Sequence, residues 1–197
     1  MWEMAEEFLS KDKYISPLIK KYGYCKIKPR IHADYFQGLV GEIIGQQLSG
    51  RVADVIYERL KKKVKGRLTT GKILALTDQE LRDCGMAWAK VRSIKDLAMR
   101  VTSNKLKVTS LDKMSDDEVM KELIAVKGIG RWTAEMFLIF SLGRADIFPD
   151  DDLGIKKGFE KVTGKKFDKE KSVKFAKNHW KPYRTIASWY LWRSLEN

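Results

Sequence analysis

The spacing of apolar residues along the chain predicts a protein built from helices. Between residues 36 and 64, apolar side chains recur every three or four positions, which is the repeat of an amphipathic helix. These positions are Val40, Ile43, Ile44, Leu48, Val52, Val55, Ile56, Leu60 and Val64. They predict one long helix or two consecutive helices. Alternating strand patterns are absent and only 4 prolines interrupt the 197 residues, so we expect an all-α fold.

Two Ser/Thr-x-x-Glu patterns mark the starts of further helices, because the two side chains of such a pair bond the first free backbone amides of a helix. The pairs are Thr77 with Glu80 and Ser115 with Glu118. The first pair opens a helix toward Cys84 and the second a helix toward Ile124. Apolar spacing and the proline at 182 predict further helices at 91–101, 153–162 and 183–195.

The charge of the chain points to a polyanionic partner. Lys and Arg number 39, Asp and Glu number 26, and the formal net charge is +13. A surplus of this size is typical of proteins that bind nucleic acid and argues against an ordinary small-metabolite enzyme.

Several other classes of protein are excluded by the residue pattern. The N-terminal residues contain neither a basic region nor an apolar region, so they do not form a secretory signal. The longest strongly apolar stretch, Met136–Leu142, is far too short to span a membrane. Cys25 and Cys84 cannot supply a disulfide framework, a four-thiolate zinc site or a four-cysteine iron–sulfur cluster. We expect a reducing compartment, either the cytoplasm with its nucleoid or the nucleus.

The segment from Leu123 to Ala134 reads as two helices joined by a tight turn with two glycines. Gly128 and Gly130 both allow positive φ and place no side chain over the turn. The turn amides and the start of the next helix can then approach a DNA phosphate, with Lys127 and Arg131 beside them. Such a contact is blind to base sequence. The alternative is a plain glycine-rich connection between packed helices, but in a chain of this charge we favour DNA binding.

This hairpin resembles that of the helix-hairpin-helix superfamily of DNA glycosylases, and other segments resemble the same family in the same order. They are Ile43–Ser49, Gly85-Met86 with Lys90 and Leu97-Ala98, Gly128–Ala134, Phe148–Ile155, and Trp180–Arg184, the last resembling the 3-methyladenine branch. The resemblance implies two helical lobes with a cleft between them. Residues 1–34 and 148–197 would form one lobe, and residues 35–147, with the hairpin at 115–142, the other. The N-terminal β domain of some bacterial relatives is not expected.

The family resemblance implies that Asp152 is the catalytic residue. Cleavage of a glycosidic bond passes through an oxocarbenium-like transition state, which a fixed carboxylate stabilises. Asp150, Asp151 and Asp152 precede a predicted helix, whose dipole favours a negative charge at its start. Asp152 stands directly before the Leu-Gly-Ile of the family loop, and Asp151 is expected to support it. The alternative is that the three aspartates only cap the helix.

One residue of the hairpin narrows the expected reaction. Relatives that also nick the DNA strand carry a nucleophilic lysine two residues after the last glycine of the hairpin. Here that residue is Trp132, and an indole cannot form a Schiff base. We therefore expect an intact strand with an abasic site as the product.

A base inside a duplex must be flipped out before it can be cleaved. The resemblance implies that Gln47 is the wedge that fills the gap, that Arg51 and Lys90 contact the DNA backbone, and that Trp132, Met136 and Trp192 line the base pocket. Aromatic faces attract cations by up to ~2 kcal/mol when desolvated, which suits an alkylated purine, itself cationic. The alternative is that the tryptophans belong to the core, where we place Trp180 and Trp189.

The expected partner is double-stranded DNA with damaged bases, bound by a monomer that uses no membrane. No cofactor is expected to be required, and the four-cysteine iron–sulfur cluster of several relatives is missing. In relatives the hairpin carbonyls can hold a monovalent cation, Na⁺ or K⁺, and the matching carbonyls here are those of Ile124, Val126 and Ile129. No cluster of metal ligands surrounds His32 or His179.

These observations predict a monofunctional DNA glycosylase that removes alkylated bases, with 3-methyladenine the first candidate. Three alternatives stay open at this point. The chain could be a glycosylase for deaminated bases such as hypoxanthine, a non-catalytic helix-hairpin-helix protein that binds DNA, or a metal-dependent nuclease that uses the three adjacent aspartates.

Overall fold

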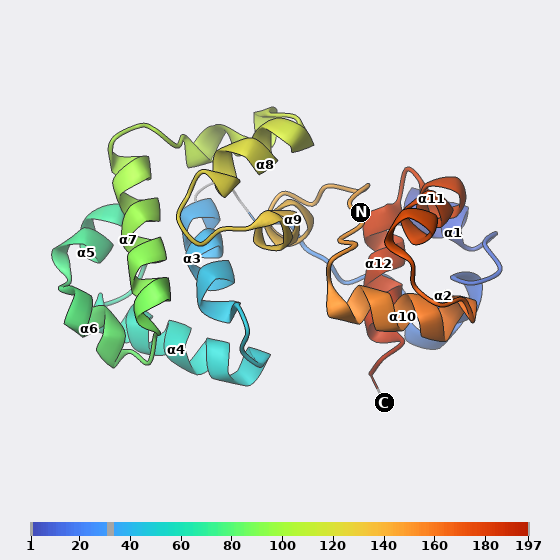
Figure 1. The fold of residues 1–197 in the computed structure, drawn as a ribbon, viewed down its shortest axis with the longest axis horizontal. Helices are drawn as coiled ribbons and strands as arrows, with labels where there is room; N and C mark the ends of the chain where they lie inside the picture. The colour runs from blue at the N-terminus through green and yellow to red at the C-terminus, as the bar shows by residue number, and fades with distance from the viewer. Residues whose placement is uncertain (1, 31–33, 197) are drawn as a thin grey trace. The chain divides into compact units, whose positions relative to one another are not determined.

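The computed structural model describes residues 2–30 and 34–196, and within these ranges it contains helices and no strand (Figure 1). The predicted all-α fold is confirmed. The helices are α1 (Glu3–Leu9), α2 (Ser16–Tyr22), α3 (Tyr35–Gly45), α4 (Gly50–Lys63), α5 (Thr70–Ala75), α6 (Asp78–Asp83), α7 (Trp88–Thr102), the 3-10 helix η2 (Val108–Lys113), α8 (Asp116–Ile124), α9 (Arg131–Phe140), α10 (Leu153–Thr163), α11 (Lys169–Trp180) and α12 (Arg184–Arg193). No helix of the described chain is long and apolar enough to cross a membrane.

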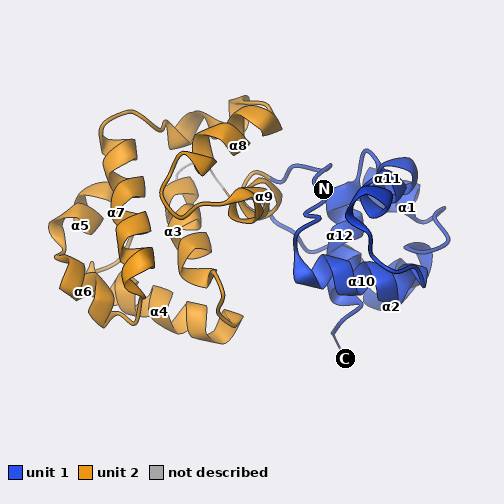
Figure 2. Ribbon diagram, viewed as in Figure 1, with its two compact units in different colours: residues 1–29, 143–197 blue, residues 30–142 orange. Residues whose placement is uncertain are grey.

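The chain divides into two compact units (Figure 2). Residues 1–29 and 143–197 form one, called here the terminal unit, and residues 30–142 form the other, the central unit. The sequence predicts the same pairing of the two chain ends, with joints at 34/35 and 147/148. In the structure the joints lie at 29/30 and 142/143.

The central unit is organised around α3, which packs against α4, α7 and α9. Its side chains Val40, Ile43 and Ile44 are completely buried, as their spacing predicts, and so is Leu39. The stretch 36–64 forms two helices, not one. The break follows α3, where Gln47 adopts a left-handed φ of 56° and the chain turns before α4 begins.

Both predicted capping boxes are present. The Thr77 side chain accepts the amide of Glu80 at the start of α6, and the Glu80 side chain accepts the amide of Thr77. Ser115 and Glu118 make the same reciprocal pair at the start of α8. These local bonds fix where the two helices begin.

The core of the terminal unit is aromatic. Trp180, Tyr190 and Phe159 are buried there, so the placing of Trp180 in the core is confirmed, and Trp189 packs against the same cluster. Helices α10 and α12 pack closely in this unit. A Cβ at Gly158 would lie 2.5 Å from the carbonyl oxygen of Leu191, so only glycine allows this close approach.

Candidate active site

Asp152 is the N-cap of α10, and two helices hold its carboxylate in place. Its Oδ1 accepts the backbone amide of Ile155, in the first turn of α10, at 2.8 Å. The same oxygen accepts the indole N–H of Trp192, on α12, at 2.8 Å. The capping role is therefore real, but it does not account for the second bond. A tryptophan from 40 residues further along the chain orients this carboxylate as well.

Gly154 makes this arrangement possible. A Cβ at this position would lie 2.8 Å from Cδ1 of Trp192 and 3.0 Å from Oδ1 of Asp152, so any side chain would displace the indole. Sequence reasoning gave Gly154 no role of its own. The sequence did contain one signal. A glycine within a helix costs about 0.5–1 kcal/mol of stability relative to alanine, so its presence indicates a position where a side chain would not fit.

The neighbouring aspartates face a different partner. Lys169, on α11, places its Nζ 3.5 Å from Oδ1 of Asp150 and 2.7 Å from Oδ1 of Asp151. Asp150 is buried and Asp151 is exposed. Asp150 and Asp151 thus pair with Lys169, whereas Asp152 accepts the indole N–H of Trp192. In the described part of the chain, no group of three or more His, Cys, Asp or Glu residues could hold a metal ion.

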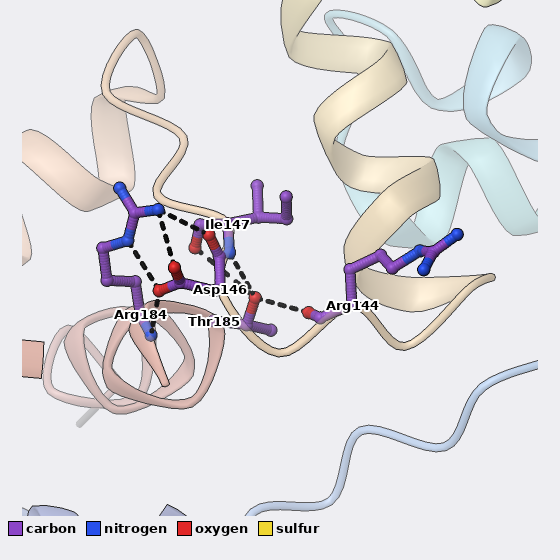
Figure 3. Close-up of polar contacts among 5 residues, drawn as sticks. All are labelled: Arg144, Asp146, Ile147, Arg184 and Thr185. Carbon is purple, nitrogen blue, oxygen red and sulfur yellow. Dashed lines mark hydrogen bonds and ion pairs between the residues drawn. The ribbon is translucent and has the colours of Figure 1, made fainter. Parts of the chain in front are cut away.

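Residues 144–147, which precede the aspartates, are hydrogen-bonded to the start of α12 (Figure 3). The guanidinium of Arg184 donates to both carboxylate oxygens of Asp146, at 2.7 and 2.9 Å, and to the Asp146 carbonyl at 2.9 Å. The Thr185 hydroxyl donates to the carbonyl of Arg144 at 2.6 Å and accepts the amide of Ile147 at 2.9 Å. A forked Arg–carboxylate pair is strong and geometrically specific. Helix α12 therefore positions both the approach to Asp152 and, through Trp192, the carboxylate itself.

The hairpin turn between α8 and α9 is supported by α7. Gly128 has a φ of 76°, and a Cβ there would lie 2.2 Å from the Ser93 hydroxyl oxygen, so glycine is required. The amide of Lys127 donates to Oδ2 of Asp96 at 2.9 Å. Gly130, in contrast, does not use the positive φ that a glycine allows: it is the N-cap of α9 with a φ of −94°. A Cβ at Gly130 would meet nothing within 4 Å, so its backbone is open to approach.

The carboxylate of Asp96, which accepts the Lys127 amide in the hairpin turn, is held in its charged form. Burial by itself raises the pKa of the Asp96 carboxyl, but hydrogen bonds from the Lys127 amide and from Arg100 outweigh it and hold the pKa below its ordinary value. The Arg100 Nε lies 2.8 Å from Oδ2 of Asp96. A charged acceptor under the turn strengthens the bond to the Lys127 amide.

Residues 40–182 match the family described as HhH-GPD superfamily base excision DNA repair protein. The chain belongs to this superfamily. The match covers the Gln46-Gln47 turn, the hairpin and the aspartate loop, which are the segments on which the resemblance was based.

Relatives of high coverage are found in yeasts. The alkylbase DNA glycosidase-like protein mag2 of Schizosaccharomyces pombe is 35% identical over 98% of this chain and 93% of its own length. The DNA-3-methyladenine glycosylase of Saccharomyces cerevisiae is 31% identical over 96% of this chain and 78% of its own. The solved structure of S. pombe 3-methyladenine DNA glycosylase (Mag1) in complex with abasic-DNA is 30% identical, with a TM-score of 0.85 over 98% of this chain and 97% of that one.

Other residues that the HhH-GPD resemblance singled out lie on the turn after α3, on α4 and on α7. Gln47 is exposed on the turn after α3, and Arg51 is exposed in the first turn of α4. Lys90, in the first turn of α7, makes two bonds within the protein. Its Nζ donates to the carbonyls of Ile44 at 2.8 Å and Gln46 at 2.7 Å. Both bonds lie within the protein, and the predicted contact of Lys90 with a DNA phosphate stays a prediction.

The predicted pocket residues are distributed between the two units of this HhH-GPD protein. Trp132 is half-buried in the first turn of α9, and Met136, one turn later, is buried. Trp192 belongs to the terminal unit, so a pocket wall shared by the three stays a prediction. Arg131, the residue before Trp132, is exposed and pairs with the buried carboxylate of Glu135 at 2.8 Å.

The predicted monovalent-cation site also stays a prediction. Ile124 is the last residue of α8, and the carbonyl of Val126 accepts the amide of Ile129 within the turn at 3.1 Å. A carbonyl oxygen has two lone pairs, so this bond leaves it able to bind a cation as well.

The two histidines have separate outcomes. His32 lies outside the described residues. Nδ1 of His179 lies 3.2 Å from Oδ2 of Asp12, and its ring stacks on Phe175 with centroids 4.1 Å apart. These contacts give His179 a structural role in the terminal unit.

Proposed function

We propose that this protein is a monofunctional DNA glycosylase that hydrolyses the N-glycosidic bond of alkylated bases in duplex DNA, with 3-methyladenine as the principal substrate. The observation that carries the proposal is the carboxylate of Asp152, held by the Ile155 amide and the Trp192 indole in the loop that the superfamily match includes. The names of the yeast relatives support the choice of alkylated bases.

In the proposed reaction, the bond between C1′ of the deoxyribose and the base breaks first, and the base leaves with the bonding electrons. The positive charge that develops on the sugar is stabilised by the Asp152 carboxylate. Water then adds to C1′ and loses a proton, which leaves an abasic site. Trp132 stands where strand-nicking relatives have a lysine, so no covalent Schiff base forms and the strand stays intact.

The remaining parts of the proposed function concern the DNA. The hairpin, with Gly128 and the open backbone at Gly130, binds a phosphate, and Gln47 enters the stack as the base leaves it. A net charge of +13 supports a duplex as the partner. We propose that the protein acts as a monomer, in the cytoplasm or the nucleus.

One assay separates this function from the alternatives. Methylated duplex DNA is incubated with the protein in parallel samples, one with Mg²⁺ and one with EDTA; free bases are measured, and the DNA is then treated with hot alkali. Base release in EDTA, with strand breaks only after alkali, supports the glycosylase. Tight binding without base release favours a DNA-binding module, and direct nicking that EDTA abolishes favours a nuclease. A parallel duplex with hypoxanthine tests the deaminated-base alternative, which faster release from that duplex would support.

A further inference from the structure

The cationic side chain of Lys90 holds the C-terminal end of α3. It extends from the first turn of α7, and its Nζ donates to the carbonyls of Ile44 and Gln46 at 2.8 and 2.7 Å. The last carbonyls of a helix lack partners within the helix and carry its negative dipole end. The Lys90 ammonium group gives these carbonyls a hydrogen-bond donor and places a positive charge at the negative end of the helix dipole. Its bond to the Gln46 carbonyl is made to the residue directly before Gln47.

The side chain of Gln46 ties the same turn to the hairpin. Its Nε2 donates to the carbonyl of Gly128 at 2.8 Å and to the hydroxyl oxygen of Thr133 at 2.9 Å. These partners lie more than 80 residues further along the chain. Gln46 is thus fixed through its backbone by α7 and through its side chain by the hairpin and α9.

Gln47 itself has an unfavourable backbone conformation. Its φ is 56°, and a left-handed conformation costs a residue with a Cβ roughly 1–2 kcal/mol. Such a conformation persists only where the surroundings over-determine it. The bonds made by Lys90 and by Gln46 act on the residue next to Gln47 and supply that constraint.

We propose that Lys90 is a positioning residue, which together with Gln46 holds Gln47 in the conformation that enters the DNA stack and keeps it in fixed register with the phosphate-binding hairpin. The inference rests on the proposed glycosylase function, because it assigns Gln47 as the wedge. It gives Lys90 a role besides the direct phosphate contact that the sequence suggested. The wedge is then pre-organised before DNA binds, so base flipping does not have to order it.

Helix α7 also supplies a matched control. Lys95 lies on the same helix, and its Nζ donates to the carbonyls of Leu74 and Leu76 at the end of α5. It also lies 3.8 Å from the carboxylate of Asp78. Lys95→Met therefore removes the same kind of lysine-to-carbonyl contact as Lys90→Met, but at a helix end that does not lead to Gln47.

The first test follows the turn without any substrate. Hydrogen exchange is measured on the free full-length protein, with attention to the amide of Leu48, which donates to the carbonyl of Gly45 across the turn at 3.1 Å. In Lys90→Met we expect exchange at Leu48 to be about tenfold faster, while in Lys95→Met it matches the wild type. Unchanged exchange at Leu48 in Lys90→Met overturns the proposal.

The second test separates positioning from binding. Single-turnover release of methylated bases should slow about tenfold in Lys90→Met, or roughly 1.4 kcal/mol, while the Kd for the duplex changes little. Lys95→Met should keep the wild-type rate. Equal slowing in both variants would mean that general destabilisation is the cause and would overturn the proposal. A wild-type protein that releases no base refutes the proposed function instead, and the exchange at Leu48 then still decides whether Lys90 holds the turn.

Discussion

Replacement of Asp152 by asparagine removes one negative charge and little else. Oδ1 of Asp152 accepts two N–H groups at 2.8 Å, from Ile155 and Trp192, and the carbonyl oxygen of an asparagine can accept both. Asparagine is also as good an N-cap as aspartate. Loss of the favourable interaction between a negative charge and the start of α10 costs about 0.3–1 kcal/mol of stability, so the variant should fold.

The effect on catalysis should be much larger. A unit charge about 4 Å from the charge that develops on the sugar is worth roughly 4 kcal/mol at an effective dielectric constant of about 20. Since about 1.4 kcal/mol corresponds to tenfold in rate, Asp152→Asn should slow base release about a thousandfold. Binding to DNA should change little, because the hairpin and the basic surface are untouched.

The assay is single-turnover release of methylated bases at saturating protein, with the Kd for duplex DNA and the Tm measured on the same preparations. Asp151→Asn is the control, since it removes the neighbouring charge, whose partner is the exposed Lys169. We expect this control to keep at least half of the wild-type rate. Full activity in Asp152→Asn together with a large loss in Asp151→Asn would show that the catalytic carboxylate is Asp151 and would refute the reasoning.

Two further predictions concern residues around the site, and a third concerns the partly buried carboxyl of Glu42. Gly154→Ala should lower the free energy of unfolding by about 1–3 kcal/mol, measured as a lower Tm, because its Cβ would displace the Trp192 indole. Base release should also slow, and an unchanged rate would show that the indole contact is dispensable. Arg184→Ala should cost about 1–3 kcal/mol in urea unfolding and slow base release, since it leaves Asp146 without its forked partner; unchanged stability would contradict this. Burial raises the pKa of Glu42 to about 7, although nearby Arg30 opposes the shift. Between pH 4.5 and about 7 the folded protein keeps a proton on Glu42 that the unfolded chain has lost. The free energy of unfolding therefore falls as pH rises through this interval, by up to about 3 kcal/mol above pH 7. Glu42→Gln should therefore make the free energies of unfolding at pH 5 and pH 8 more similar than they are in the wild type. If the difference between the two pH values stayed the same, the pKa of Glu42 would not be raised.

The sequence by itself determined the helices whose signals are local. The capping boxes at Thr77 and Ser115 act over three residues, and both helices begin where those pairs predict. The N-cap role of Asp152 is equally local and was visible as an aspartate run before an apolar repeat. The family motifs added the superfamily and the candidate roles, because each motif is a short stretch of consecutive residues.

Only the tertiary structure decided what those residues contact. The bonds of Trp192 to Asp152, of Arg184 to Asp146 and of Lys90 to Gln46 each join positions about 40 residues apart. Such pairs depend on how helices pack, and their packing depends on the summed burial of many side chains. A short stretch of sequence therefore cannot predict how the helices pack. For this reason the bonds of Lys90 at the end of α3 were not foreseen, and the need for glycine at Gly154 became visible only from the position of the Trp192 indole.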